Sequence, residues 1–372
     1  MYDKQKQIVA DITAQVGITI NGSKKYDIKV LDDKFYPALL ANGTLGFGES
    51  YMDGYWECDQ IDELTSKLLM RESDTKIQSK LTLIAEHLKA KVLNQQNKIR
   101  SKKVAEEHYN VGNDLYELML DKYMQYTCGY WKEAKTLKAA QEAKLDLVCK
   151  KLGLKKGMKI LELGSGFGGL SYWMAKKYGC TVEAYNISTE QVKFARTLCK
   201  GLPVTFHVRD YREATGLFDR VVSIGMMEHV GPKNYAGFME LAHSRLIDGG
   251  LFLMHTIGGN LSELTTEPWF GKYIFPGSVL PSVQQIAKAS EGIFVMEDWH
   301  NLSTDYDKTL MAWFERFDKG WSKISGKYNE RFYRMWKYYL LMAAGSFRAR
   351  KNQLWQVVFS KGVYKGGYKS IR

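Results

Sequence analysis

Short apolar runs bounded by turn residues alternate with longer segments of helical spacing over most of the chain after residue 137. An apolar run of this length predicts a buried strand, and apolar residues three and four positions apart predict an amphipathic helix. The predicted strands are residues 159–163, 181–185, 204–208, 218–223, 251–257, 294–298 and 354–359. The predicted helices cover 138–151 and 234–245 and begin near 169, 188 and 305. This alternation predicts an α/β fold, with helices on both faces of a largely parallel sheet.

The first 70 residues follow another pattern and predict a small mixed α/β domain. Helical spacing at 4–16 and 35–42 brackets two predicted strands, at 17–22 and 27–31. The segment 43–58 mixes glycines with aromatic residues, which predicts an irregular loop.

Two further segments indicate how the chain is organised. The basic run 98–103 predicts an exposed connector, so we divide the chain into an N-terminal domain, 1–104, and a larger domain, 105–372. The segment 259–290 is apolar but interrupted by prolines and glycines. This pattern predicts a segment that covers the substrate site and does not form part of the sheet.

A glycine-rich turn at 164–169 joins the first strand of the large domain to the following helix. Glycines allow the backbone to approach a ligand, and the free amides at a helix start supply hydrogen-bond donors. One such turn does not identify its ligand, because it can also serve only to pack a helix on a sheet.

The ends of the next two strands narrow the choice of ligand. The second strand leads to Asn186, where a dinucleotide-binding enzyme usually has an acid for the ribose, and the third leads to Asp210 and Tyr211. This series of parts resembles the S-adenosylmethionine-dependent methyltransferase fold, in which an acid after the third strand often reaches the adenine. NAD binding is less favoured because the glycine turn is not repeated in a second half.

Composition indicates an ordinary globular protein, with 45% hydrophobic and 25% charged residues. Five cysteines without a CxxC pair argue against a disulfide framework and against a structural zinc site. We see neither a signal-peptide pattern nor an apolar window long enough to span a bilayer, and therefore expect a cytoplasmic protein.

The positive charge is concentrated near the end of the chain. Residues 316–372 hold 14 Lys and Arg against 2 Asp and Glu, an excess equal to the net charge of +12 for the whole chain. Aromatic residues lie among these cations. The segment could bind nucleic acid or an anionic membrane surface, or it could be a solvated helix face over a packed core. We favour core packing for the rings and a polyanionic partner for the cations.

Several motifs together resemble one family, the bacterial cyclopropane-fatty-acyl-phospholipid synthases. They occur in both predicted domains and in the order of the family, at residues 17–23, 46–56, 107–109, 125–131, 227–235, 255–258, 272–277, 305–307 and 353–359. Ser165 and Phe167 stand where the family often has Cys and Trp, which leaves the backbone role of the turn intact.

The resemblance implies transfer of the S-adenosylmethionine methyl group to a cis double bond in a phospholipid acyl chain. The carbocation that forms then loses a proton and closes to a cyclopropane. An isolated alkene is a weak nucleophile, so the enzyme must align it with the sulfonium and exclude water. Aromatic rings can stabilise both cations. The candidate rings are Tyr126, Phe167, Tyr211, Tyr273 and Tyr306.

The resemblance also implies that the proton acceptor is a bound bicarbonate ion. Its predicted ligands are Cys128, Glu228, His255, the backbone of Ile257, and Tyr306. His255 and Tyr306 can donate to carbonate oxygens, and Glu228 can accept from the bicarbonate hydroxyl and orient His255. A zinc site built on the Cys, Glu and His is disfavoured because the three lie in unrelated segments, so we predict no metal.

For the cofactor, the resemblance assigns residues to each part of S-adenosylmethionine. Tyr126 and Thr127 are expected over the methionine moiety, with Gly164, Ser165 and Gly166 beneath it. The ribose would be surrounded by Asn186, Ile187 and Gln191, and the adenine by Asp210 and Tyr211.

We therefore predict a lipid-engaging N-terminal domain, and an enzyme bound peripherally to the phospholipid bilayer at the inner face of the cell membrane. Members of this family are often dimers, so a homodimer is possible, and no nucleic-acid partner is expected. Two rival functions remain open: a methyltransferase acting on RNA or on another small molecule, and a non-catalytic lipid-binding protein that keeps the cofactor fold.

Overall fold

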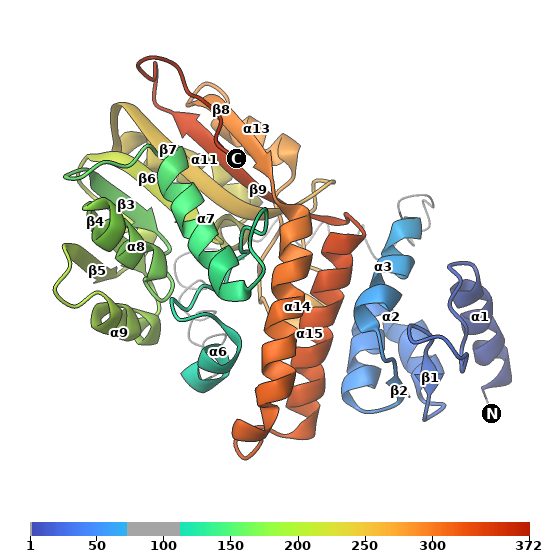
Figure 1. Ribbon diagram of the computed structural model, residues 1–372. Helices are drawn as coiled ribbons and strands as arrows, with labels where there is room; N and C mark the ends of the chain where they lie inside the picture. Colours follow the sequence, from blue (N-terminus) through green and yellow to red (C-terminus); the bar gives the residue numbers. More distant parts are fainter. Residues whose placement is uncertain (1, 73–111) are drawn as a thin grey trace.

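The computed structural model describes residues 2–72 and 112–372 (Figure 1). The predicted domain boundary near 104, the basic connector 98–103 and the motif at 107–109 lie outside these residues, so they stay predictions.

The large domain is built on a seven-stranded sheet with the strand order β5-β4-β3-β6-β7-β9-β8. β3 through β7 run parallel, and β9 is antiparallel to both β7 and β8. All seven predicted strands are present, as β3 (Lys159–Leu163), β4 (Thr181–Asn186), β5 (Val204–Val208), β6 (Phe218–Ile224), β7 (Leu246–Gly259), β8 (Val295–Asn301) and β9 (Asn352–Ser360).

Helices cover both faces of the sheet because successive strand residues point to opposite sides. Ile160 of β3 packs with one apolar cluster and Leu161 with the other. The first face carries α7 (Leu137–Lys151), α8 (Gly169–Tyr178) and α9 (Thr189–Leu198), and the second carries α11 (Tyr235–Ser244) and α13 (Val283–Ser290). The α/β fold class predicted from the sequence is confirmed.

Local capping explains where two of these helices begin. The Thr136 hydroxyl accepts from the amide of Ala139 at the start of α7, and the Ser188 hydroxyl accepts from the amide of Gln191 at the start of α9. The remaining short elements are α6 (Asn113–Met119), α10 (Met227–Val230) and α12 (Pro268–Tyr273), with 3-10 turns at Tyr211–Glu213, Pro232–Asn234 and Trp321–Lys323.

The N-terminal part is more helical than the sequence pattern predicts. It contains α1 (Asp3–Ala14), α2 (Phe35–Met52) and α3 (Ile61–Glu72), with a small antiparallel pair of β1 (Lys29–Val30) and β2 (Trp56–Glu57). The strand predicted at 17–22 is wrong, since the structure has only a single bridge there, between Ile20 and Ile28.

The irregular loop predicted at 43–58 is also wrong, because α2 continues through most of it. The helix kinks at Gly43, whose φ of 56° suits glycine, and then resumes. Phe47 and Tyr51, one helical turn apart, both contact the buried ring of Trp56. This packing outweighs the low helix propensity of the glycines.

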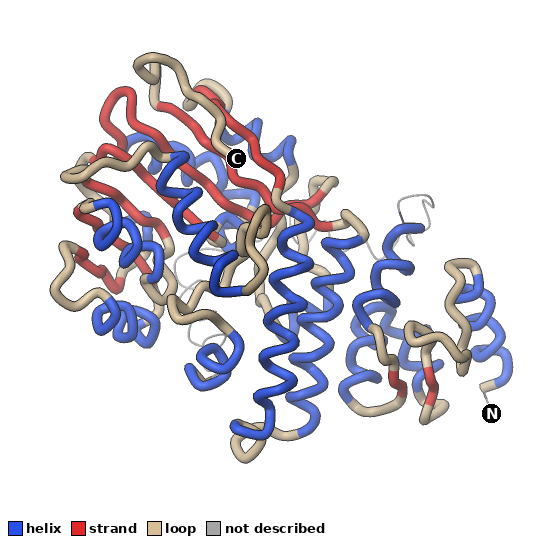
Figure 2. Tube along the Cα trace, in the orientation of Figure 1, coloured by secondary structure: helices blue, strands red, loops and turns tan. Residues whose placement is uncertain are grey.

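A long helical hairpin connects the two parts of the molecule. α14 (Ser303–Gly320) and α15 (Glu330–Arg348) pack on each other, and α15 also packs against α2 and α3. Figure 2 shows the hairpin standing between the sheet and the N-terminal helices. One continuous apolar cluster joins the hairpin to the N-terminal part, with Trp313 and Trp336 among its buried members.

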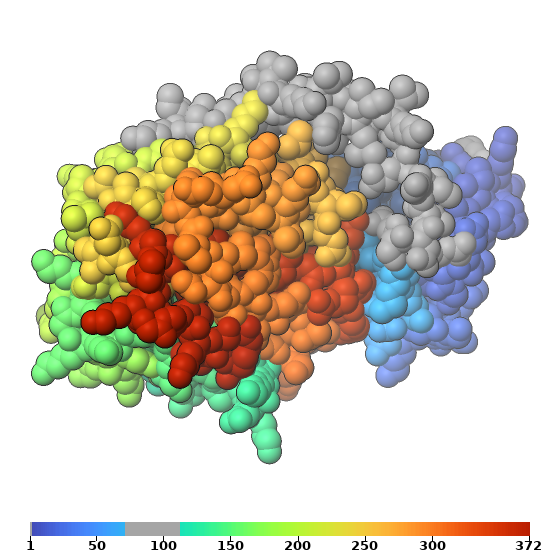
Figure 3. Space-filling model, turned by 90° about the horizontal axis from the view of Figure 1, so that it is seen from above, coloured from blue at the N-terminus to red at the C-terminus, as the bar shows by residue number. Residues whose placement is uncertain are grey.

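The basic segment 316–372 is partly neutralised within the molecule. Among the described residues, at least seven of its fourteen cations pair with carboxylates from outside the segment, namely Lys319, Lys327, Arg331, Arg334, Arg348, Lys361 and Arg372. Four of the carboxylates, Asp53, Glu57, Asp62 and Glu63, belong to the N-terminal part. Figure 3 shows the last residues, in dark red, lying on the surface beside segments drawn in orange and green. These pairs give part of the segment a role within the molecule, and binding of a polyanionic partner by the cations as a set stays a prediction.

Within residues 2–72 and 112–372, no helix is both long and apolar enough to cross a membrane.

Candidate active site

A cavity of about 280 Å³ opens at the carboxyl ends of the central parallel strands. Ligands of open α/β sheets bind at this edge. The cavity brings together fourteen of the fifteen predicted site residues, from segments far apart in the chain: Tyr126, Thr127, Gly164, Ser165, Gly166, Asn186, Ile187, Gln191, Asp210, Tyr211, Glu228, His255, Ile257 and Tyr306. Cys128 is the exception. The individual roles of these residues remain predictions.

The glycine turn forms the floor of one half of the cavity. A side chain added at Gly166, whose φ is 51°, would point into open space, so the turn leaves room for a ligand there. The hydroxyl of Ser165 is buried and has no hydrogen-bond partner among the described residues. A buried polar atom without a partner is rare in proteins, and a bound ligand would satisfy it. Both observations fit S-adenosylmethionine at this turn.

Asn186 and Asp210 line the same half, but their polar groups already have partners within the protein. The Asn186 amide donates to the carbonyl of Gly166 (3.0 Å) and to Gln191 Oε1 (2.9 Å). The Asp210 carboxylate accepts from the backbone and the side chain of Arg212 at 2.9 and 2.8 Å. Asn186 therefore ties the end of β4 to the glycine turn, which gives it a structural role besides the predicted one at the ribose.

Lys144 on α7 holds the loop over the cofactor half, a role that no sequence motif predicted. Its buried ammonium donates to Gln125 Oε1 (2.5 Å) and Thr127 Oγ1 (2.9 Å), and both acceptor residues line the cavity. Asp121 accepts from the amides of Tyr123 and Gln125 at 2.9 Å each. Burial lowers the pKa of Lys144 to about 8. In the sequence Lys144 looks like one more helix-forming residue.

Glu228, at the start of α10, is the principal polar group of the other half. Its Oε1 accepts from the backbone amide of Ile257 at 2.6 Å, while its buried Oε2 has no hydrogen-bond partner among the described residues. Burial raises the pKa of Glu228 to about 7. The amide of Ile257 is thus directed to Glu228, and the structure has no hydrogen bond by which Glu228 orients His255.

His255 is oriented instead by Gln356 of β9, a residue of the motif at 353–359 for which the sequence predicted no role. The Nε2 atom of Gln356 lies 3.2 Å from Nδ1 of the imidazole, and both side chains are buried. Burial, together with the positive charges of Lys144 and Lys151, holds the pKa of His255 well below its usual value. The imidazole is therefore neutral at physiological pH.

Aromatic side chains surround the space between the two halves. The hydroxyl of Tyr126 donates to that of Tyr339 at 2.8 Å, and both residues line the cavity with Tyr306 and Phe167. Burial raises the pKa of the Tyr306 phenol, which stays protonated and can donate. Tyr273, another predicted ring, lies outside the lining, and its hydroxyl donates to Glu49 at 2.6 Å.

Cys128 is fully buried behind the cavity rather than in its wall. Its thiol lies 3.1 Å from the carbonyl of Gly129 and 3.8 Å from Thr309 Oγ1. Burial raises the pKa of the thiol, so it is neutral. In the described parts of the chain, no group of three His, Cys, Asp or Glu side chains is placed to hold a metal ion.

The segment predicted as a substrate cover supplies one wall of the cavity. Between β7 and α13 it contributes Phe275, Pro276, Gly277, Ser278 and Leu280 to the lining. With Tyr339 and Leu354, these residues make the Glu228 half largely apolar. The arrangement can shield a reactive group from water while holding a few polar atoms in fixed positions.

Comparisons with known proteins identify the family of this chain. Residues 96–357 match the family model of mycolic acid cyclopropane synthetase. The chain is 49% identical over 98% of its length to the cyclopropane-fatty-acyl-phospholipid synthase of Escherichia coli strain K12, covering 95% of that protein. It is 34% identical to a probable fatty acid methyltransferase of Pseudomonas putida, over 71% of this chain and 70% of that protein.

Two solved structures resemble the large domain. The cyclopropane synthase MmaA2 from Mycobacterium tuberculosis has a TM-score of 0.66 at 27% identity, covering 70% of this chain and 98% of that one. Mycolic acid cyclopropane synthase CmaA1, in complex with SAH and CTAB, has a TM-score of 0.66 at 28% identity with the same coverage. The predicted relationship is confirmed: the chain belongs to the cyclopropane synthase family, together with the bacterial cyclopropane-fatty-acyl-phospholipid synthases.

Proposed function

We propose that this enzyme transfers a methylene group from S-adenosylmethionine to the cis double bond of unsaturated acyl chains in membrane phospholipids, with a bound bicarbonate ion as the proton acceptor. Its family establishes it as an S-adenosylmethionine-dependent enzyme of the cyclopropane synthase type. One observation carries the proposal: a single cavity joins a cofactor turn to an apolar chamber that contains Glu228, His255 and Tyr306.

When bound at the glycine turn, S-adenosylmethionine supplies a methyl group on a positively charged sulfur. Tyr126, Phe167 and Tyr306 present aromatic rings to the cavity, and each ring facing a cation contributes about 0.5–2 kcal/mol. The apolar cover and Leu354 keep water from the acyl chain, because water at a carbocation would give an alcohol instead of a ring.

The polar atoms of the chamber fit a small anion that carries one hydroxyl group. The unpartnered Oε2 of Glu228 can accept from that hydroxyl, and the protonated phenol of Tyr306 can donate to an oxygen. A neutral His255 has one N–H group and can donate to another oxygen. Bicarbonate has this set of donors and acceptors and would collect the proton released at ring closure. Cys128 was also predicted to bind the bicarbonate, but its thiol lies behind the cavity wall and could reach the ion only from there.

The substrate and location follow from the same chemistry and are also part of the proposal. A long apolar acyl chain is the class of ligand that the chamber suits, and phospholipids present such chains at a membrane surface. We propose peripheral binding at the inner face of the cell membrane through the N-terminal domain and exposed cations such as Lys323, Lys365 and Lys369, by an enzyme that can form a homodimer.

The test is methyl transfer from radiolabelled S-adenosylmethionine to liposomes of unsaturated phospholipid, with liposomes of saturated phospholipid as the matched control. We expect label in the unsaturated lipid only, and a mass gain of one CH2 per modified acyl chain. Buffer depleted of bicarbonate should slow turnover, and added bicarbonate should restore it.

Equal labelling of both lipids, or labelling of added RNA instead, would contradict the proposed substrate. Full activity in bicarbonate-free buffer would contradict the proposed proton acceptor while leaving the substrate assignment in place.

A further inference from the structure

A row of three polar side chains crosses the sheet from the cavity to the opposite edge. Gln356 of β9 is paired in register with His255 of β7 on one side and with His300 of β8 on the other. Residues that are directly paired in antiparallel strands point to the same face of the sheet. Gln356 is 0% exposed and lies outside the cavity lining, so it touches neither the cofactor space nor the substrate space.

The amide of Gln356 has two unlike ends, and only one has a hydrogen-bond partner. Its Nε2 lies 3.2 Å from Nδ1 of His255. Its Oε1 is buried without a hydrogen-bond partner among the described residues. With the nitrogen toward His255, the amide donates to Nδ1, and the single proton of the neutral imidazole must then be on Nε2.

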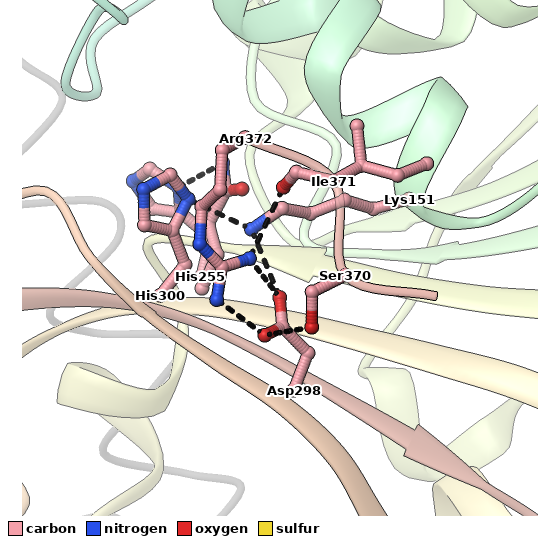
Figure 4. Close-up of polar contacts among 8 residues, drawn as sticks. Lys151, His255, Asp298, His300, Ser370, Ile371 and Arg372 are labelled. Atoms are coloured by element: carbon pink, nitrogen blue, oxygen red, sulfur yellow. Dashed lines mark hydrogen bonds and ion pairs between the residues drawn. The ribbon is translucent and has the colours of Figure 1, made fainter. Parts of the chain in front are cut away.

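A buried positive charge lies at the His300 end of the row. The ammonium of Lys151 is 3.0 Å from His300 Nδ1 and 3.5 Å from Asp298 Oδ2, and Lys151 is 0% exposed. Arg372 donates twice to Asp298, at 2.6 Å each (Figure 4). Figure 4 shows Lys151 and Arg372 converging on Asp298, with His300 beside the ammonium.

This charge favours one orientation of the amide. A carbonyl oxygen turned toward the His300 side faces the positive end of the row, whereas an NH2 group turned that way would be repelled by it. The orientation that places oxygen toward Lys151 is the one that places nitrogen against His255.

We propose that Gln356 is a positioning residue that fixes His255 in the tautomer with its proton on Nε2, and that the Lys151–Asp298–Arg372 cluster sets the direction of the Gln356 amide. The inference rests on the proposed function in one respect, since His255 must act as a donor in the cavity. The set of residues that position His255 then extends through β9 to side chains that lie outside the cavity lining.

The test reads the His255 tautomer directly, by NMR of protein labelled with 15N-histidine and free of any ligand. We expect wild-type His255 to carry its proton on Nε2. In Gln356→Glu the carboxylate can only accept, so the proton should move to Nδ1. In Gln356→Met, with neither donor nor acceptor, both tautomers should be populated.

A matched control exists on the same strand. Gln353 is also buried, but it bonds to Ser303 and Arg350 and does not line the cavity. Gln353→Met should leave the His255 tautomer unchanged. Turnover on unsaturated liposomes should fall roughly tenfold or more in both Gln356 variants, with KM for S-adenosylmethionine unchanged.

Wild-type His255 with its proton on Nδ1, or a tautomer that does not respond to Gln356→Glu, would overturn the inference. The NMR result is independent of activity. Tautomers that shift as expected in an enzyme that makes no cyclopropane would support the role of Gln356 and count against the proposed function.

Discussion

At the scale of single residues, the site depends on buried polar groups that have lost their hydrogen bonds to water and have not replaced all of them with hydrogen bonds to protein groups. Glu228 is the clearest case, since one oxygen accepts from the amide of Ile257 and the other is buried without a hydrogen-bond partner among the described residues. An ionised carboxylate in this position costs free energy of folding. The same cost makes the carboxyl ready to accept a hydrogen bond from a ligand.

Replacing Glu228 by Gln should therefore reveal a pH-dependent stability difference. The folded-state pKa of about 7 lies above the ordinary value of 4.5, so the wild type loses stability as pH rises between these values. Below pH 4.5 the carboxyl is neutral in both states, and above pH 7 the loss is complete, on the order of 3 kcal/mol. Gln keeps the oxygen that accepts from Ile257 but cannot ionise.

Urea unfolding of both proteins at a series of pH values, in bicarbonate-free buffer, measures this difference. Glu240→Gln, an exposed change on α11, is the control. We also expect Glu228→Gln to bind S-adenosylmethionine normally and to lose most turnover. Normal turnover, or a stability difference that does not change with pH, would contradict the role given to Glu228.

At the scale of elements, helix α7 supports the loop that covers the cofactor half. The contact is specific, because the Lys144 ammonium bonds to the side chains of Gln125 and Thr127, which both line the cavity. A packed helix and a cofactor loop are thereby linked through one buried charge.

We expect Lys144→Met to weaken S-adenosylmethionine binding by about tenfold, because the loop loses two charge-assisted hydrogen bonds. Isothermal titration calorimetry with S-adenosylmethionine measures the change. Lys138→Met, an exposed change on the same helix, should bind like the wild type. Equal affinity in Lys144→Met would show that the loop holds its position without the lysine.

The elements also show how far the sequence could predict this molecule. Strands β3 and β5 have their predicted bounds. β3 is buried between its neighbours and leaves a mostly apolar run, whereas β5 is an edge strand in which apolar and polar residues alternate. The second half of α2 was missed because its helical state depends on packing of Phe47 and Tyr51 against Trp56, which propensity does not contain. Family motifs led to Glu228, His255 and Tyr306. Lys144 lies in no motif, and the motif at 353–359 contains Gln356 without indicating its role, since both roles arise only when distant elements meet.

At the scale of the whole molecule, the positive charge has two uses. Arg334 pairs with Glu57 and Arg348 with Asp62, so part of the basic segment joins the helical hairpin to the N-terminal part. Lys323, Lys365 and Lys369 are exposed and are among the cations that remain available for an anionic surface.

Activity on anionic liposomes should therefore fall as salt is added, because screening shortens the reach of exposed cations from ~30 Å at 0.01 M to ~8 Å at 0.15 M. Initial rates on anionic and on zwitterionic vesicles, over a series of NaCl concentrations, test this. We expect a steep fall for the anionic vesicles and little change for the zwitterionic ones. A flat response on both would exclude electrostatic docking as the source of membrane binding.

The position of β9 has a consequence for how the protein is made. β9 is the last strand in sequence, yet it lies between β7 and β8 and contributes Leu354 to the cavity wall. On the ribosome, both neighbours are synthesised first, and each keeps an open hydrogen-bonding edge until residues 352–360 emerge. A nascent chain therefore exposes both edges to other chains until β9 has emerged and paired with them.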